Sequence, residues 1–349
     1  MAAEETLKWA PKFIGSMEIA GLAAEIGETV GRMESEGFLE KHPAVREDYP
    51  LSAALGTLIL EDSDLTMEDM KALARKKETE GLPRAELEAM NALKAYSGLS
   101  GIDPGFPDDV LRAHGVLTKG LLLESGCYRS GNMGIYYGNA LVHEGAPARE
   151  IAGKMERLCQ WARETRAHPL VRACVFHYEL EYIYPFADGN GPLGRLCQAA
   201  ILAKWKPLLQ YAPVEAVLAR RKRGYLNALI RAENREDGGE FVLFMLEVIR
   251  DALGEMQRIG GKKITGNRQK PVSGNSGTAS KEDGRDRLLS FIRSAPSCTQ
   301  EELAGMMEKS PRTVRAMMRA LQEEGVIRRE GARKNGVWVI SGEEQHGDH

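Results

Sequence analysis

The fold is decided by residues 168–202, which read HPLVRACVFHYELEYIYPFADGNGPLGRLCQAAIL. Two apolar segments flank a short stretch rich in glycine, YPFADGNGPLGR, at residues 184–195. His168-Pro169 is typical of a helix start, and we expect this helix to run to about Ile183 with an apolar face towards a core. The Gly-Asn-Gly triplet predicts a tight turn where the next helix begins.

This glycine-rich turn has the features of a phosphate site. The backbone N–H groups of Gly189, Asn190 and Gly191 can converge on one point, where the helix dipole also favours an anion. Asp188 can hold Mg²⁺ on a nucleoside polyphosphate, because Mg²⁺ prefers carboxylate and phosphate oxygens. Arg195, one turn into the helix, can donate two N–H groups to a distal phosphate. The alternative is an ordinary helix–helix turn with a surface aspartate, and the spacing alone does not decide between them.

Length and composition narrow the class of protein. At roughly 150 residues per domain, the 349 residues suggest two or three domains. There are 47 Lys and Arg against 50 Asp and Glu, so the net charge of −3 excludes a wholly basic nucleic-acid coat and an acidic disordered chain. Since 43% of residues are hydrophobic and few are aromatic, we expect an aliphatic, mainly helical core.

Cysteine usage and the N-terminal segment indicate the compartment. The five cysteines are scattered and form no C-x-x-C pair, which argues against a disulfide framework or a zinc ribbon. The segment MAAEETLKWAPKF lacks both the basic start and the apolar run of a secretory signal. No apolar run approaches the ~20 residues that a membrane helix needs. We therefore expect a cytoplasmic protein without a membrane partner.

A flexible linker is predicted at residues 260–284, GGKKITGNRQKPVSGNSGTASKEDG, because the segment is rich in Gly, Ser and Lys and has no apolar period. It separates a large N-terminal part from a module at residues 285–340, and residues 341–349 form a short tail. In the N-terminal part, residues 133–145 (MGIYYGNALVHEG) predict one β-hairpin in an otherwise helical domain.

The segment at residues 168–202 resembles the Fic domain family, which transfers AMP from ATP onto protein hydroxyls. The family's loop reads H-P-F-x-[D/E]-G-N-G-R-x-x-R, and the chain has YPFADGNGPLGR. The resemblance extends from about residue 10 to 260. It implies a mainly α fold, in which a Fic-type helical bundle carries a short β-hairpin flap. It also implies N-terminal helices over residues 1–100, a Fic core over residues 101–259, and ATP with Mg²⁺ as ligands.

Two positions of the loop depart from the family's pattern. The family's general-base histidine is Tyr184 here and its first arginine is Pro192, whereas its second arginine is kept as Arg195. A phenol with a pKa of ~10 is protonated at pH 7 and cannot take the proton of a target hydroxyl. Proline removes a cation and a backbone N–H from the cradle. The resemblance therefore implies a catalytically impaired regulator that binds a nucleotide or a partner.

An active adenylyltransferase with a nonstandard base is the alternative. Tyr184 could lose its proton beside a cation, or His177 or His143 could act in its place. We expect His177, in the middle of a helix, to be a hydrogen-bonded core residue, and His143, at the edge of the hairpin, to be solvated. A lost general base costs about 10²–10⁴ in rate, and a replacement must satisfy geometry as well as pKa.

Residues 55–62, LGTLILED, resemble the family's inhibitory helix, [S/T]-x-x-x-E-[G/N]. Thr57 and Glu61 match this pattern, and Asp62 replaces the usual glycine or asparagine. In the family this glutamate pairs with the second arginine of the loop and blocks the γ-phosphate, so the resemblance implies that Glu61 pairs with Arg195. The alternative is an ordinary glutamate at the end of a helix.

The resemblance also implies a protein partner at the hairpin. Family members dock an extended stretch of the target along it by strand addition, which places the target at residues 134–142. Tyr136 and Tyr137 could hold this stretch. The alternative is a hairpin that only covers the pocket.

Residues 285–340 show the pattern of a winged helix-turn-helix. Helical spacing predicts three helices, with Thr299 and Ser310 capping the second and third, and two short strands follow around Asn335-Gly336. The module holds eleven basic and seven acidic residues, so it is positively charged while the whole chain is not.

The positions of these basic residues predict DNA binding. Arg312, Arg315 and Arg319 lie opposite the apolar stripe of the third helix, as a recognition helix in a major groove requires. Arg333 and Lys334 fall at the tip of the wing, where phosphates or a minor groove would be contacted. A DNA-binding transcriptional regulator with a Fic-like sensor is therefore a further hypothesis. Protein contact, including a homodimer, is the alternative.

Overall fold

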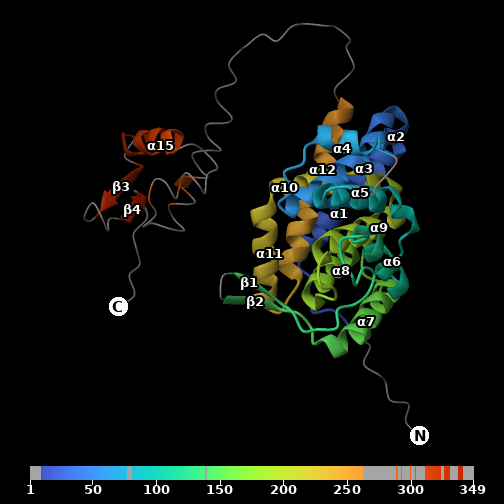
Figure 1. Ribbon diagram of the computed structural model, residues 1–349. Helices are drawn as coiled ribbons and strands as arrows, with labels where there is room; N and C mark the ends of the chain where they lie inside the picture. Colours follow the sequence, from blue (N-terminus) through green and yellow to red (C-terminus); the bar gives the residue numbers. More distant parts are fainter. Residues whose placement is uncertain are drawn as a thin grey trace. The chain divides into compact units, whose positions relative to one another are not determined.

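The computed structural model describes residues 9–76, 81–137 and 140–261, and in the C-terminal part residues 288–289, 292, 299, 303, 311–323, 326–330 and 337–340. The chain divides into two compact units, Met1–Ile264 and Thr265–His349 (Figure 1). Nearly all of the expected linker lies outside the described residues.

The first unit is a bundle of α-helices from which one hairpin projects (Figure 1). Its first helices are α1 (Met17–Ser35), α2 (Phe38–Lys41), α3 (Pro43–Leu60), α4 (Met67–Leu73), α5 (Arg84–Ser97) and α6 (Pro107–Leu117). The later helices are α7 (Ile151–Glu164), α8 (Pro169–Ile183), α9 (Asn190–Trp205), α10 (Val214–Arg220), α11 (Lys222–Asn234) and α12 (Gly239–Gly261). Short 3₁₀ turns are η1 (Leu99–Gly101), η2 (Ala148–Glu150) and η3 (Pro207–Tyr211), and strands β1 (Gly134–Tyr137) and β2 (Ala140–Glu144) pair antiparallel. The expected mainly α fold with one hairpin is confirmed.

Helix α8 is the centre of this unit. Its side chains are buried on nearly every side, because α7, α9 and α12 all pack against it. Helix α9 approaches very closely: a Cβ atom at Gly194 would lie only 2.5 Å from Cδ2 of His177. Glycine at position 194 is therefore what lets the two helices on either side of the glycine-rich loop meet.

A second close approach places the end of α3. This helix packs against α5 and α10, and a Cβ at Gly56 would lie 2.6 Å from the backbone carbonyl carbon of Glu215. The helix ends at Leu60, and Glu61 follows as its C-terminal cap. Asp62 then takes a left-handed backbone with φ of 63°. This conformation favours glycine or asparagine, the residues usual at this position in the pattern that α3 resembles.

The second unit contains α15 (Pro311–Glu323) and the antiparallel strands β3 (Ile327–Glu330) and β4 (Val337–Ile340). Its buried core comprises Leu288, Ile292, Leu303, Val314, Met318, Leu321, Ile327 and Trp338. The third helix and the two strands that we expect here are present. Most of the first two helices, and the turn at Asn335-Gly336, lie outside the described residues.

Two further expectations concern the chain as a whole. Among the described helices, none is both long enough and apolar enough to cross a bilayer. In the same part of the chain Cys127, Cys159, Cys174 and Cys197 carry free thiols.

Candidate nucleotide-phosphate site

The loop between α8 and α9 is tightly folded. Tyr184, the first residue after α8, has a left-handed backbone with φ of 52°, and Gly189, with φ of 81°, precedes α9. The side chain of Asn190 closes the turn: its Oδ1 accepts from the Phe186 N–H at 3.0 Å, and its Nδ2 donates to the Phe186 carbonyl at 2.9 Å. The amide side chain of Asn190 thus maintains the shape of the loop, and only its backbone N–H is left for a ligand.

Two residues from earlier in the chain support the loop. The Arg129 guanidinium donates to the carbonyl of Tyr184 at 2.7 Å and to that of Ala146 at 2.5 Å. His114 stacks on Phe186 with ring centroids 3.8 Å apart, and its Nε2 lies 3.0 Å from the Asp188 carbonyl oxygen. These contacts span 55 and 74 residues of sequence, so no local pattern could have revealed them.

The start of α9 offers two amides to an anion. The first N–H groups of a helix have no acceptor within the helix, and proline at position 192 has no N–H to give. Gly189 donates its N–H to Oδ1 of Asp188 at 2.8 Å, inside the loop itself. Of the expected cradle, the amides of Asn190 and Gly191 therefore remain for a ligand.

Arg195 lies at the base of this cradle and is held by α3. It is only 3% exposed, and one of its Nη atoms donates to Oε1 of Glu61 at 2.6 Å. Its Nε donates to Oγ1 of Thr57 at 2.7 Å. Burial alone would lower the pKa of the guanidinium, but Glu61 reverses this and the pKa of Arg195 is raised. The two side chains that the resemblance pairs, Glu61 and Arg195, are thus in contact, and the arginine is charged.

A second carboxylate, Glu181, faces the same point and was not identified from the sequence. Oε1 of Glu181 accepts from the Tyr225 hydroxyl at 3.1 Å, and that hydroxyl lies 3.1 Å from Nε2 of His177. A Cβ atom at Gly191 would meet Glu61, Arg195 and Glu181 within 3.4 Å. Burial raises the pKa of Glu181 to about 7, although Arg195 acts in the opposite direction. One arginine therefore faces two carboxyl groups directly over the helix start.

Tyr184 occupies the position of the family's base but is a poor base. Burial raises the pKa of its phenol above the usual value, and the neighbouring Glu181 raises it further. A hydrogen bond with the Asn190 side chain lowers the pKa, and Arg129 is electrostatically coupled to the phenol, but neither outweighs burial, so the pKa of Tyr184 stays above its usual value. The phenol therefore keeps its proton at neutral pH.

The two histidines considered as replacements differ sharply. His177 is fully buried, hydrogen-bonded to Gln198 and Tyr225, and its pKa is lowered to about 3 by burial, so it is the core residue that we expect. His143 is not solvated, and that expectation was wrong. It is 7% exposed, because β2 turns the ring inwards against Tyr184, at 6.0 Å between centroids, and against Glu233 on α11.

The expected magnesium ligand, Asp188, is an exposed side chain. One oxygen accepts the Gly189 N–H and the other lies 3.7 Å from a guanidinium nitrogen of Arg84. No group of three potential metal ligands occurs among the described residues. A cavity of about 230 Å³ opens beside Asp188, between the end of α3 and the loop, with walls that include Leu58, Leu121 and Pro192.

Several expected contact residues can be placed only in part. The two strands of the hairpin are described, but its turn, Gly138-Asn139, and the side chains of Tyr136 and Tyr137 lie outside the described part. On α15, Arg315 and Arg319 are exposed on the side away from the buried Val314 and Met318. The side chain of Arg312, and the expected wing-tip residues Arg333 and Lys334, lie outside the described residues.

Comparison with known proteins places this loop in a family. The family model described as Fic/DOC family matches residues 103–202, which include the whole loop. The crystal structure of a Fic family protein from Desulfovibrio desulfuricans G20 is 33% identical, covers 97% of this chain and 100% of that one, and superposes with a TM-score of 0.67. The chain belongs to the Fic family.

This Fic protein is also similar to more distant proteins, one by structure and one by sequence. A Fic domain containing signaling protein from Bacteroides thetaiotaomicron is 17% identical, with 72% of this chain and 100% of that chain covered and a TM-score of 0.57. Protein adenylyltransferase Fic from Drosophila mojavensis is 28% identical over 107 residues, which are 30% of this chain. The chain spans about a fifth of the length of the curated relatives it matches. A model described as winged helix-turn-helix DNA-binding matches residues 283–328.

Proposed function

We propose that this Fic protein is a nucleotide- or partner-binding regulator that keeps the family's phosphate cradle but carries out little AMP transfer. The observation that carries the proposal is Tyr184. It stands where the family has its general base, and the pKa of its phenol is raised above the usual value. A group that is protonated at pH 7 cannot remove the proton of an attacking hydroxyl.

The cradle fits a polyphosphate only in part. The amides of Asn190 and Gly191 and the guanidinium of Arg195 are donors that would hold phosphate oxygens, and Asp188 would hold Mg²⁺. Against this, Glu61 already occupies Arg195 at 2.6 Å, and Glu181 faces the same space. A bound polyphosphate must displace Glu61 from Arg195 or lie short of it. We therefore propose that the contact between Glu61 and Arg195 is inhibitory.

The experiment is adduct formation with Mg-ATP, followed by mass spectrometry on the protein itself and on added protein substrates. The wild type is compared with the double variant Tyr184→His/Pro192→Arg, which restores the family's two missing side chains. We expect AMP adducts in the double variant at a rate at least 100-fold above the wild type. If the wild type forms AMP adducts as fast as the double variant does, the proposal is contradicted.

One observation favours a second candidate, an active transferase in which His143 is the base. Nδ1 of His143 lies 2.6 Å from Oε1 of Glu233, and a carboxylate can only accept there, so the neutral ring has its lone pair on Nε2. That Nε2 is buried and has no hydrogen-bond partner among the described residues. A histidine oriented by a carboxylate, with its other nitrogen unengaged, is the arrangement of many general bases.

Variants of the two aromatic residues separate the candidates. If His143 is the base, His143→Gln lowers wild-type adduct formation about 100-fold, and Tyr184→Phe leaves it unchanged. Glu233→Gln should reduce the rate in the same direction by disturbing the ring's orientation. If adduct formation is absent in the wild type, or survives His143→Gln, the second candidate is rejected.

For the second unit we propose DNA binding through α15. Arg315 and Arg319 are exposed, and their face of the helix is opposite the core formed by Val314 and Met318. Arg329 has a different role, since its guanidinium lies over the Trp338 ring at 5.3 Å and packs β3 against β4.

A salt titration of duplex binding by fluorescence anisotropy tests this proposal. Log affinity should fall linearly with log salt, and Arg315→Ala/Arg319→Ala should reduce the slope by about two. Lys94→Ala, a change on α5 of the first unit, is the matched control and should leave the slope unchanged. Affinity that does not depend on salt would rule out the proposal.

A further inference from the structure

A cavity of about 490 Å³ lies on the face of α8 that the cradle does not use. Its walls come from the N-terminal segment before α1, the residues that follow β2, α7, α8 and the turn before α12. On α8, Tyr178, Glu179 and Tyr182 line it, whereas His177 and Glu181 belong to the network at the cradle. A volume of this size is within the range of small-ligand pockets.

The cavity contains a buried carboxyl group without a cation partner. Glu179 is 6% exposed and belongs to none of the ion pairs among the described residues. Burial raises its pKa to about 7, whereas a hydrogen bond with the backbone N–H of Lys12 and the ammonium groups of Lys154 and Lys12 act in the opposite direction. A buried carboxylate is stabilised by a paired cation, and no cation of the described residues lies within ion-pair distance of Glu179.

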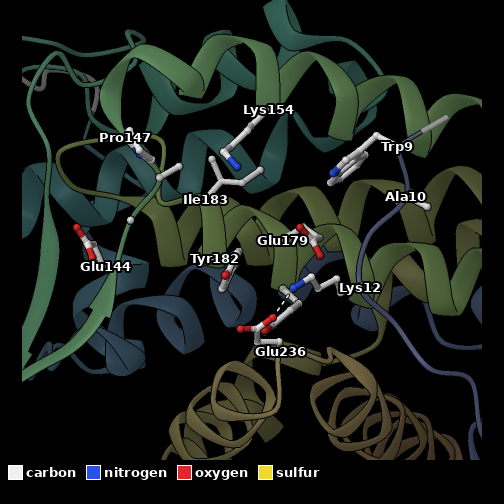
Figure 2. Close-up of a pocket in the computed structure, with 13 residues that line it drawn as sticks. Trp9, Ala10, Lys12, Glu144, Pro147, Lys154, Glu179, Tyr182, Ile183 and Glu236 are labelled. Carbon is white, nitrogen blue, oxygen red and sulfur yellow. Dashed lines mark hydrogen bonds and ion pairs between the residues drawn. The ribbon is translucent and has the colours of Figure 1, made fainter. Parts of the chain in front are cut away.

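The two ammonium groups nearby are already engaged with other carboxylates. Lys12 pairs with Glu236, as Figure 2 shows, and the Nζ atom of Lys154 lies 3.7 Å from Oε2 of Glu150. Glu144, at the end of β2, adds a further carboxylate to the lining. The lining therefore carries more negative than positive charge, which disfavours an anionic ligand.

Aromatic and aliphatic side chains complete the cavity. In Figure 2, Trp9 and Tyr182 lie on either side of Glu179, and Ile183 forms part of the wall nearby. The rings of Tyr178 and Tyr182 are stacked, with centroids 6.0 Å apart. Aromatic faces attract cations, and they also pack against aliphatic chains.

We propose that this cavity binds an alkylammonium or guanidinium group, with its charge at Glu179 and its aliphatic chain against Trp9 and Ile183. The ligand is of the class formed by lysine and arginine side chains and by free diamines, since all present one cation on a flexible apolar stem. This site does not depend on nucleotide binding or on AMP transfer, because none of its residues belongs to the cradle.

Calorimetric titration of the full chain without nucleotide tests the proposal. The probes are Nα-acetyl-lysine methylamide, cadaverine and, as the uncharged control, Nα-acetyl-norleucine methylamide. We expect both cations to bind in the millimolar range and the norleucine derivative at least tenfold more weakly. Tighter binding of the lysine derivative indicates a polypeptide side chain as the source, and tighter binding of cadaverine indicates a free amine.

Two substitutions with opposite expected signs make the test decisive. Glu179→Gln should weaken cation binding at least tenfold, whereas Lys154→Gln, which removes a repelling charge, should strengthen it about two- to fivefold. Glu25→Gln, an exposed change on α1, is the control and should have no effect. If Glu179→Gln does not fold, Lys154→Gln tests the proposal by itself. Loss of the Lys154 charge strengthens binding at a cation site and weakens binding at an anion site. Absence of binding, equal binding of the norleucine derivative, or an unchanged affinity in Glu179→Gln overturns the proposal.

Discussion

The two ends of the loop at residues 184–195 differ in what they have kept. At the Arg195 end, the guanidinium is buried and bonded to Thr57 and Glu61, so the cation that would bind a phosphate is present but occupied. At the Tyr184 end, the backbone is left-handed with φ of 52°, and the side chain is a phenol whose pKa is raised above its usual value. At one end the phosphate-binding group is present and held by a carboxylate, and at the other the residue type differs from that of the family's loop.

The largest expected effect comes from restoring the catalytic end while the other end is released. In the Glu61→Gly background, adding Tyr184→His/Pro192→Arg should raise the rate of AMP adduct formation by about 10²–10⁴, because a base and a cation are both returned. Time courses followed by mass spectrometry measure this rate. Equal rates of adduct formation with and without the restored residues would contradict the view that Tyr184 and Pro192 limit AMP transfer.

The carboxyl group between the two ends should affect stability through pH. The pKa of Glu181 is raised to about 7 by burial, so the folded protein keeps its proton while the unfolded chain loses it near pH 4.5. Its contribution is therefore complete below pH 4.5 and is lost as the pH rises to about 7. Glu181→Gln should reduce the decline in unfolding free energy over this window by up to about 3 kcal/mol, measured by urea denaturation at several pH values.

The same measurement on Glu215→Gln is the matched comparison, because burial also raises the pKa of that carboxyl to about 7 and Arg195 lowers the pKa of both. Both variants should flatten the pH dependence. Of the two variants, Glu181→Gln alone should also change ATP affinity, since Glu181 lies beside Gly191 and Glu215 does not. An effect of Glu215→Gln on ATP of the same size would show that the change is not local.

Release of the Arg195 end by itself should change binding rather than chemistry. Glu61→Gly frees the guanidinium from its partner at 2.6 Å, and we expect ATP to bind about tenfold more tightly in a calorimetric titration. Because Arg195 is only 3% exposed, the variant leaves a buried guanidinium without its charge partner, so the loss of stability should exceed the ~1 kcal/mol of an exposed ion pair. An unchanged affinity for ATP would show that the contact is not inhibitory.

The smallest effect concerns the residue after Glu61. Asp62 has φ of 63°, where a side chain is unfavourable, and its ion pair with Lys222 is 90% exposed on the aspartate side. Asp62→Gly should therefore raise stability by about 0.5–1 kcal/mol, because the relief of backbone strain exceeds the weak surface pair. Thermal melting of the wild type and of Asp62→Gly measures this change in stability. A lower melting temperature in the variant would contradict the argument from backbone strain.

The sequence predicted those features that are encoded within one segment. The period of apolar residues indicates α8, because a chain with 3.6 residues per turn places them on common faces. The hairpin follows from a short β-prone run around a turn, and the resemblance to the Fic pattern paired Glu61 with Arg195 across 134 residues. The prediction that His143 is solvated failed, since the strand pattern says nothing of what covers an edge residue.

The sequence by itself determined the helical bundle, the glycine-rich turn and the tyrosine at the first position of the Fic-like loop, because each depends on residue type and local spacing. Only the tertiary structure decided which groups surround that turn. Glycines 56 and 194 let α3 approach α10 and α9 approach α8. Other contacts between segments distant in sequence bury Glu179, turn His143 towards Tyr184 and enclose the cavity on the far face of α8. Burial and neighbouring charge set the chemistry of an ionisable side chain, and both come from segments that its own sequence does not identify.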